Sequence, residues 1–118
     1  MATINTHDGT LSIRFSRFEK IFGLVRDLDL PLSSVSDVSS EPSGLAAVRG
    51  LRAPGLGMPG VRAVGTWRGR GHKSLVSVSR GQGAVSAAVS GSRYDRILIG
   101  VDDPQRYVDQ INAARTRP

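Results

Sequence analysis

The sequence predicts a mostly β fold with a short internal helix and a C-terminal helix, and three observations lead to it. Apolar and polar residues alternate over several short segments, as they do in strands with one buried face. Turns rich in glycine separate these segments. Apolar residues recur at helical spacing in two places, near residue 20 and near the C-terminal end. At 118 residues the chain suits one domain, 1–118, with a core large enough to fold without cross-links.

The first predicted element is a β-hairpin. Segments 2–6 and 10–16 alternate in polarity and flank His7-Asp8-Gly9, and an Asp-Gly pair between alternating segments is a strong hairpin signal. In the second segment, alternate apolar residues are expected to face the core: Leu11, Ile13 and Phe15.

A short amphipathic helix is predicted after the hairpin. Ser16 and Glu19 have the spacing of a capping box, in which each side chain satisfies a free N–H group of the first helical turn. The apolar residues at helical spacing are Phe18, Ile21, Phe22 and Val25. We interpret them as anchors to the core rather than as contacts to a ligand.

An interrupted strand is predicted next. Leu28 and Leu30 alternate with acidic residues, and Pro31 removes a donor from the ladder, which indicates an edge strand or a break. The acidic residues of this segment are Asp27, Asp29 and Asp37. Their spacing matches no calcium-binding loop, so we interpret them as the polar face of a strand rather than as metal ligands.

The segment 50–60 is dense in glycine and proline, which excludes a helix or a central strand. We interpret it as an ordered surface connection between two sheets, because neither half of the chain has enough core to fold alone. Pro54 and Pro59 remove donors that a phosphate-binding loop needs. Leu56 and Met58 are expected either to pack onto the sheets or to contact a partner.

Four short strands with glycine turns between them are predicted for the second half, and we expect them to form an antiparallel meander. Their ranges are 61–68, 74–80, 84–90 and 93–101.

The chain ends in a predicted amphipathic helix. Asp102 or Asp103 is its expected N-cap, and Pro104 fits the first helical turn. The apolar stripe of this helix consists of Tyr107, Val108, Ile111 and Ala114.

Five segments and the final helix carry a resemblance that spans almost the whole chain. The segments read DGTLSIRFS, FEKIFGLV, LDLPLSSVSDV, RGLRAPGLGMPGVRAVGTWR and YDRILIGVDDP. They resemble small pleckstrin-homology-like (PH-like) proteins that are abundant in actinobacteria. The resemblance implies a bent antiparallel β-barrel of about seven strands, open at one corner, with the C-terminal helix as its plug, and it implies no catalysis.

Two departures from the lipid-binding members of that group limit what the resemblance implies. Those members carry basic residues around the first hairpin loop, whereas here the loop is His7-Asp8-Gly9. They also usually place a tryptophan in the final helix, whereas the tryptophan of this chain is Trp67. Phosphoinositide binding is therefore not expected.

The charge of the chain is unevenly distributed. The formal net charge is +6, and no acidic residue lies between Pro42 and Tyr94, an interval that contains basic residues from Arg49 to Arg93. This basic surface could attract nucleic acid or an anionic membrane, or it could be a solvated strand surface. The first hypothesis is nevertheless a non-enzymatic module that binds a protein or peptide, or a second copy, through a sheet edge or a groove beside the C-terminal helix. The candidate interaction surface comprises Leu56, Met58, Arg62, Trp67, Arg68, Arg70 and Lys73.

The sequence also argues against most enzyme classes. There is no cysteine, which excludes a thiolate metal site or a cysteine nucleophile. His7 and His72 both lie in predicted turns, and neither has an evident nucleophile or orienting acid beside it. We therefore expect no catalysis, no cofactor, no metal and no small-molecule substrate. No signal peptide or membrane-spanning run is evident, so the expected location is the cytoplasm.

Overall fold

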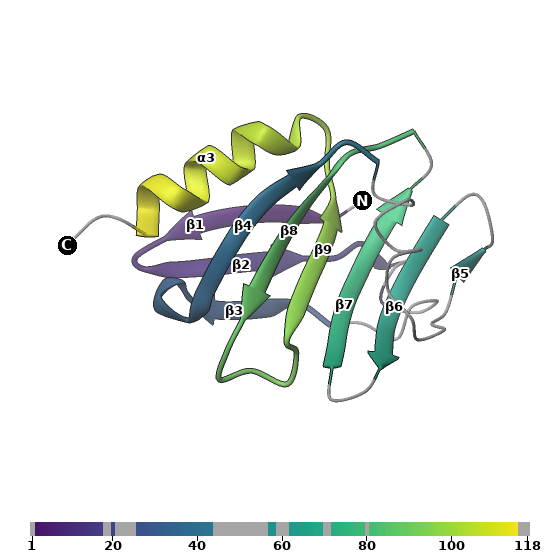
Figure 1. Cartoon of the computed structure of the whole chain (residues 1–118), viewed down its shortest axis with the longest axis horizontal. Helices are drawn as coiled ribbons and strands as arrows, with labels where there is room; N and C mark the ends of the chain where they lie inside the picture. Colours follow the sequence, from purple (N-terminus) through teal and green to yellow (C-terminus); the bar gives the residue numbers. More distant parts are fainter. Residues whose placement is uncertain are drawn as a thin grey trace.

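The computed structural model describes residues 2–17, 20, 26–43, 57–58, 62–69, 72–79 and 81–115. The fold is mostly β, with two sheets and a C-terminal helix (Figure 1). In chain order the elements are β1 (Thr3–His7), β2 (Thr10–Arg14), β3 (Leu28–Pro31), the 3₁₀ turn η1 (Leu32–Ser34), β4 (Val35–Glu41), β5 (Gly57–Met58), β6 (Arg62–Gly69), β7 (His72–Ser79), β8 (Ala84–Val89), β9 (Arg96–Gly100) and α3 (Pro104–Arg115).

The first sheet has three antiparallel strands in the order β1-β2-β3. The predicted hairpin is confirmed: Asp8 and Gly9 connect β1 to β2 with φ angles of 48° and 74°. Positive φ at both central residues is the signature of a type I′ turn, whose twist matches that of the flanking strands. The Leu28–Pro31 strand was predicted to be an edge strand or to contain a break, and among the described residues it is an edge, since β3 pairs there with β2 alone.

The second sheet has the order β4-β8-β9-β7-β6-β5, so the predicted meander is wrong. β9 lies between β8 and β7 and runs parallel to β7. The reason lies in the burial of β9, where Ile97 and Ile99 face one side and Leu98 faces the other, and all three are at most 3% exposed. A strand that is apolar on both faces is stabilised most in the interior of a sheet.

The main core lies between the two sheets and α3. Leu11 and Ile13 of β2 are fully buried in it, as the alternation predicted, and Phe15 is 6% exposed. Ile97 and Ile99 of β9 and Val108 and Ile111 of α3 belong to the same cluster, so their expected burial in one core is confirmed. Phe18 and Phe22, which were expected to join them, lie outside the described residues.

The helix α3 connects the two sheets at one corner of the molecule (Figure 1). Ser40 of β4 donates a hydrogen bond to Gln105 Oε1 at 2.9 Å, and Gln110 Nε2 donates one to Thr6 Oγ1 of β1 at 3.1 Å. Pro104 is the first helical residue, as predicted. The carbonyl of Asp103 accepts the N–H of Arg106 at 3.2 Å and thereby closes the first turn.

The expected barrel of about seven strands is matched only in its coarser features. In the described part of the chain the sheets have three and six strands, and no ladder joins them into a closed barrel. The start of the predicted internal helix is visible as a bond from the Lys20 N–H to the Ser16 carbonyl at 3.0 Å. This is the i to i−4 spacing of an α-helix. Within the same described part, no helix is both long and apolar enough to cross a membrane.

Candidate functional site

The side of the three-stranded sheet that faces away from the core is polar, and we call it the polar face. Strand alternation places one set of side chains on it: Thr3, Asn5 and His7 of β1, Thr10, Ser12 and Arg14 of β2, and Asp29 and Pro31 of β3. In register, Asn5 and Asp29 are the two neighbours of Ser12 across the sheet. Ser12 is only 3% exposed, because it lies at the centre of this face.

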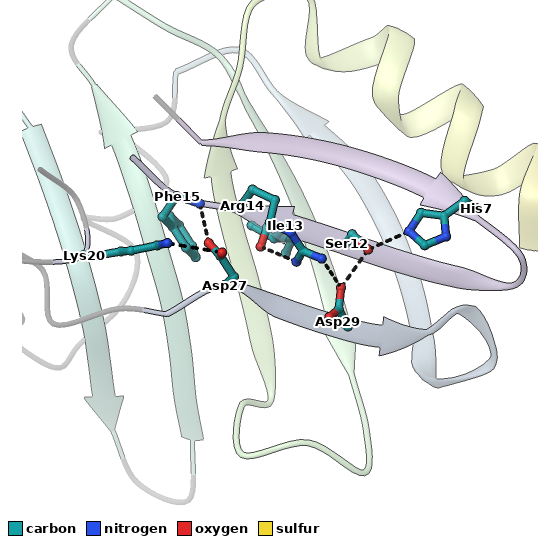
Figure 2. Close-up of polar contacts among 8 residues, drawn as sticks. All are labelled: His7, Ser12, Ile13, Arg14, Phe15, Lys20, Asp27 and Asp29. Carbon is teal, nitrogen blue, oxygen red and sulfur yellow. Dashed lines mark hydrogen bonds and ion pairs between the residues drawn. The ribbon is translucent and has the colours of Figure 1, made fainter. Parts of the chain in front are cut away.

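A line of polar contacts crosses the polar face (Figure 2). His7 Nε2 lies 3.2 Å from Ser12 Oγ, and Ser12 Oγ donates to Asp29 Oδ1 at 2.7 Å. Arg14 Nη2 lies 3.0 Å from the same Asp29 oxygen. Since the hydroxyl proton of Ser12 is directed to Asp29, the His7 ring donates its Nε2–H to Ser12. The line therefore has a direction, from imidazole to hydroxyl to carboxylate.

Asp27 makes a second set of contacts at the end of β2 (Figure 2). Its Oδ1 accepts the backbone N–H of Phe15 at 2.8 Å, and its Oδ2 accepts Lys20 Nζ at 3.2 Å. The carboxylate thus satisfies the donor of the residue that follows β2.

The pKa values of both aspartates lie below their ordinary range. The backbone hydrogen bond from Phe15 is the main cause for the lowered pKa of Asp27, and Lys20 adds to it. For Asp29, the hydrogen bond from Ser12 is the main cause of the lowered pKa, followed by that from Arg14. Both carboxylates are therefore ionised at neutral pH and are weak bases.

The geometry of the polar line suits positioning better than nucleophilic catalysis. In a serine nucleophile site the imidazole lies between hydroxyl and carboxylate and removes the hydroxyl proton. Here the hydroxyl lies between the other two groups, and its proton points to a carboxylate that is a weak base. No group of three or more His, Asp or Glu side chains that could hold a metal occurs among the residues that the structure describes.

The predicted turn position of His7 is wrong, because His7 is the last residue of β1, and its ring contacts the Ser12 hydroxyl, which in turn contacts Asp29. Part of this arrangement was accessible from the sequence. A two-residue turn at 8–9 places His7 diagonally opposite Ser12 on one face of the hairpin. The contribution of Asp29 was not accessible, because it depends on the pairing of β3 with β2 across the intervening segment.

The predicted interaction surface is partly described. Trp67 is 8% exposed and packs in a second apolar cluster with Val76, Val78, Ala84 and Leu98. Lys73 is half-buried, and its backbone N–H donates to Asp95 Oδ2 at 2.8 Å. Met58 and Arg62 are paired in register, as are Arg68 and Lys73. Leu56 and Arg70 lie outside the described residues, as do the side chains of Met58, Arg62 and Arg68.

The sheet edges differ in how easily they could accept another strand. β3 has four residues, carries the exposed Asp29 and ends at Pro31. β4 is interrupted by a register shift between Ser36 and Ser39, where Asp37 has a φ of 49°. β5 has two residues. Proline, bulges, charge and short length are the devices that protect edges from pairing.

β1 itself carries none of these features, although α3 packs beside it and Gln110 of α3 bonds to Thr6. Its five residues contain no proline, no Asp, Glu, Lys or Arg, and no register shift. In a two-residue hairpin the pair that flanks the turn, His7 and Thr10, exchanges both hydrogen bonds. The alternate residues Ile4 and Thr6 therefore direct their backbone N–H and C=O groups away from β2, toward the outer edge of β1 near α3.

Comparison of the chain with protein-family models, curated proteins and solved structures finds no match.

Proposed function

We propose that this chain is a non-enzymatic interaction module that adds a strand of a partner protein, or of a second copy, to the free edge of β1 beside α3. The observation that carries the proposal is the difference between the edges. β3 and β4 carry protective features and β5 has two residues that pair with Arg62 and Ala63 of β6, whereas β1 has no proline, charge or register shift and lies beside α3. In this mode of recognition the main-chain bonds give affinity and the alternate side-chain sites give specificity.

The polar face supports the proposal by making the edge rigid. A strand that is already ordered loses less conformational entropy when another strand pairs with it. The contacts from His7 through Ser12 to Asp29 tie β1, β2 and β3 together across the sheet. The bond between Gln110 and Thr6 fixes the other side of β1 to the helix.

The finer fold assignment is part of this proposal. We infer a PH-like arrangement, in which two bent sheets form an incomplete barrel and the helix closes one corner. The sequence segments that resemble that group and the bridging position of α3 support it. The absence of cysteine fits a cytoplasmic protein.

Electrostatic binding of nucleic acid or an anionic membrane by the Arg49–Arg93 interval is the alternative. It is favoured by the absence of acidic residues between Pro42 and Tyr94. Salt separates the two functions, because charge-driven binding weakens steeply as the salt concentration rises whereas pairing at a strand edge responds little. Capture from cytosol with and without nuclease treatment separates a protein partner from a nucleic acid.

The test places positive charge on each edge in turn. Thr3→Lys plus Asn5→Lys adds two exposed lysines to β1, and Ser36→Lys plus Ser39→Lys adds two exposed lysines to the bulged edge of β4. Each exposed change is expected to alter the free energy of unfolding by no more than about 0.5 kcal/mol. Self-association is read by sedimentation equilibrium, and partner retention by affinity capture from nuclease-treated cytosol.

We expect the β1 variant to lose the associated species and the β4 variant to keep it. Loss in the β4 variant alone would place the contact on the other edge. A partner that is captured only when the nuclease is omitted would support the electrostatic alternative instead.

A further inference from the structure

The side of the six-stranded sheet that faces away from the main core carries an arginine in an unusual position. The pairing registers define one row of residues across this outer face: Trp67, Ser74, Arg96, Ala88 and Ser36, one each from β6, β7, β9, β8 and β4. The neighbours of Arg96 on both adjacent strands are therefore small. Ser36 is exposed and Ala88 is half-buried, so the row opens to solvent on the β8 and β4 side of Arg96.

Arg96 is half-buried, and its guanidinium is held by a neutral group. Its Nη1 donates to Ser86 Oγ at 2.9 Å, and Ser86 lies in the next row of the same face. Other cationic side chains in the described part of the chain have a charged partner or an exposed position. Arg14 and Lys20 each pair with an aspartate, and Arg115 bonds the Asn112 amide in an exposed position. Arg96 combines partial burial with a neutral partner.

Both groups of this pair have hydrogen-bond donors to spare. A guanidinium has five N–H donors in a planar fork that matches a carboxylate or a phosphate. Ser86 is 5% exposed and accepts from Arg96, and among the described contacts its own hydroxyl proton has no acceptor. A buried hydroxyl without an acceptor is uncommon, because leaving such a group unsatisfied costs free energy.

The row of the outer face that contains Arg96 holds no acidic side chain. Arg93 is exposed and lies at the same end of β9 as Arg96, whereas Lys73 precedes Ser74 and so alternates to the opposite side of the sheet. The nearest acidic residue along the strand, Asp95, alternates to the other side and accepts the Lys73 N–H. On β4, Asp37 lies in the bulge that follows Ser36, and Glu41 lies two rows away from the Arg96 row.

We propose that Arg96 and Ser86 form a binding site for an oxyanion group, a carboxylate or a phosphate, on the outer face of the six-stranded sheet. The free edge of the Arg96 fork binds two oxygens of the anion, and the Ser86 hydroxyl donates to one of them. This site lies on the six-stranded sheet, whereas β1 belongs to the three-stranded sheet. The proposal therefore does not depend on the proposed function.

The test follows the Arg96 side chain itself. The Nε–H resonance of Arg96 is recorded by NMR while inorganic phosphate or acetate replaces chloride at constant ionic strength. We expect a saturable shift of this resonance and of the Ser86 amide, with at least one of the two anions. The anion that binds more tightly identifies the source of the oxyanion group as a phosphate or a carboxylate.

Two variants separate a fork from simple charge attraction. Arg96→Lys keeps the charge but loses the planar fork, and we expect affinity to fall by about tenfold or more. Arg115→Lys is the matched control, since Arg115 also bonds a neutral oxygen but is exposed on α3, and it should leave the affinity unchanged. Ser86→Ala should weaken binding without removing the charge.

Linear shifts that are equal at Arg96 and Arg115 would overturn the proposal, as would unchanged affinity in Arg96→Lys. If Arg96→Lys does not fold, the titration of the unaltered protein and the Ser86→Ala variant decide the matter. No saturation with either anion in the unaltered protein would also refute it.

Discussion

Truncation of Ile111 tests whether α3 packs against the core beside β1. Ile111 is 1% exposed and belongs to the main core together with Leu11 and Ile99. Ile111→Ala removes three carbon atoms from this environment. At about 0.8 kcal/mol for each buried CH₂ group the transfer loss is about 2.4 kcal/mol.

Two further terms adjust this magnitude. The cavity left behind adds to the loss, because the surrounding side chains relax only in part. Alanine favours the helix by about 0.5 kcal/mol relative to isoleucine, which offsets some of it. We therefore expect the free energy of unfolding to fall by about 2–4 kcal/mol, a large fraction of the roughly 5–15 kcal/mol of a typical domain.

Urea denaturation followed by circular dichroism measures this change. With a slope of about 1–3 kcal/mol per molar urea, the midpoint should fall by roughly 1–2 M at an unchanged slope. Gln110→Ala is the control on the neighbouring exposed position, and it should cost no more than about 1 kcal/mol through the lost bond to Thr6. A loss below about 1 kcal/mol for Ile111→Ala would show that α3 is not docked on the sheets and would refute the reasoning.

Two other predictions concern the polar face and the second sheet. The lowered pKa values of Asp27 and Asp29 mean that their contribution to stability is present above the ordinary value of 3.8 and is lost as the pH falls through the lower folded-state values. Urea midpoints from about pH 7 to about pH 2.5 should therefore fall in the acid range, and less steeply in Asp29→Asn; an identical acid profile would contradict the role of Asp29. An added Cβ at Gly100 would lie 2.6 Å from Gln82 Oε1 and 3.1 Å from the Ser77 carbonyl oxygen. Gly100→Ala should therefore cost about 1–3 kcal/mol, with part of it recovered in the double variant with Gln82→Ala; a neutral effect of Gly100→Ala would show that this contact is not close-packed.

Local patterns were enough to predict the elements that depend on neighbouring residues. The turn at Asp8 and Gly9 and the helix that begins at Pro104 follow from residue types that only a few backbone conformations accept. The buried face of Leu11 and Ile13 follows from their alternation.

The order of the second sheet depends on pairing over longer distances, and the sequence pattern led to the wrong order. RILIG at Arg96–Gly100 alternates no more clearly than its neighbours, yet it is inserted between β7 and β8. The sequence signal that could have revealed a central strand is the uninterrupted apolar run Ile97-Leu98-Ile99, since all three residues are buried. The polar line could not be predicted from the sequence for the same reason, because Asp29 reaches Ser12 only through the pairing of β2 with β3.

Amide hydrogen exchange at β1 tests the central claim most directly. In the free protein the amides of Thr3, Asn5 and His7 should be protected by β2, whereas those of Ile4 and Thr6 should exchange rapidly. In the species that sedimentation or affinity capture retains, whether a partner complex or a second copy, we predict that exchange at Ile4 and Thr6 slows by about tenfold or more. The amides of Ser36 and Ser39 on β4 should be unchanged. Unaltered exchange at Ile4 and Thr6 in that species, or protection confined to β4, would contradict the assignment of β1 as the edge that accepts a strand.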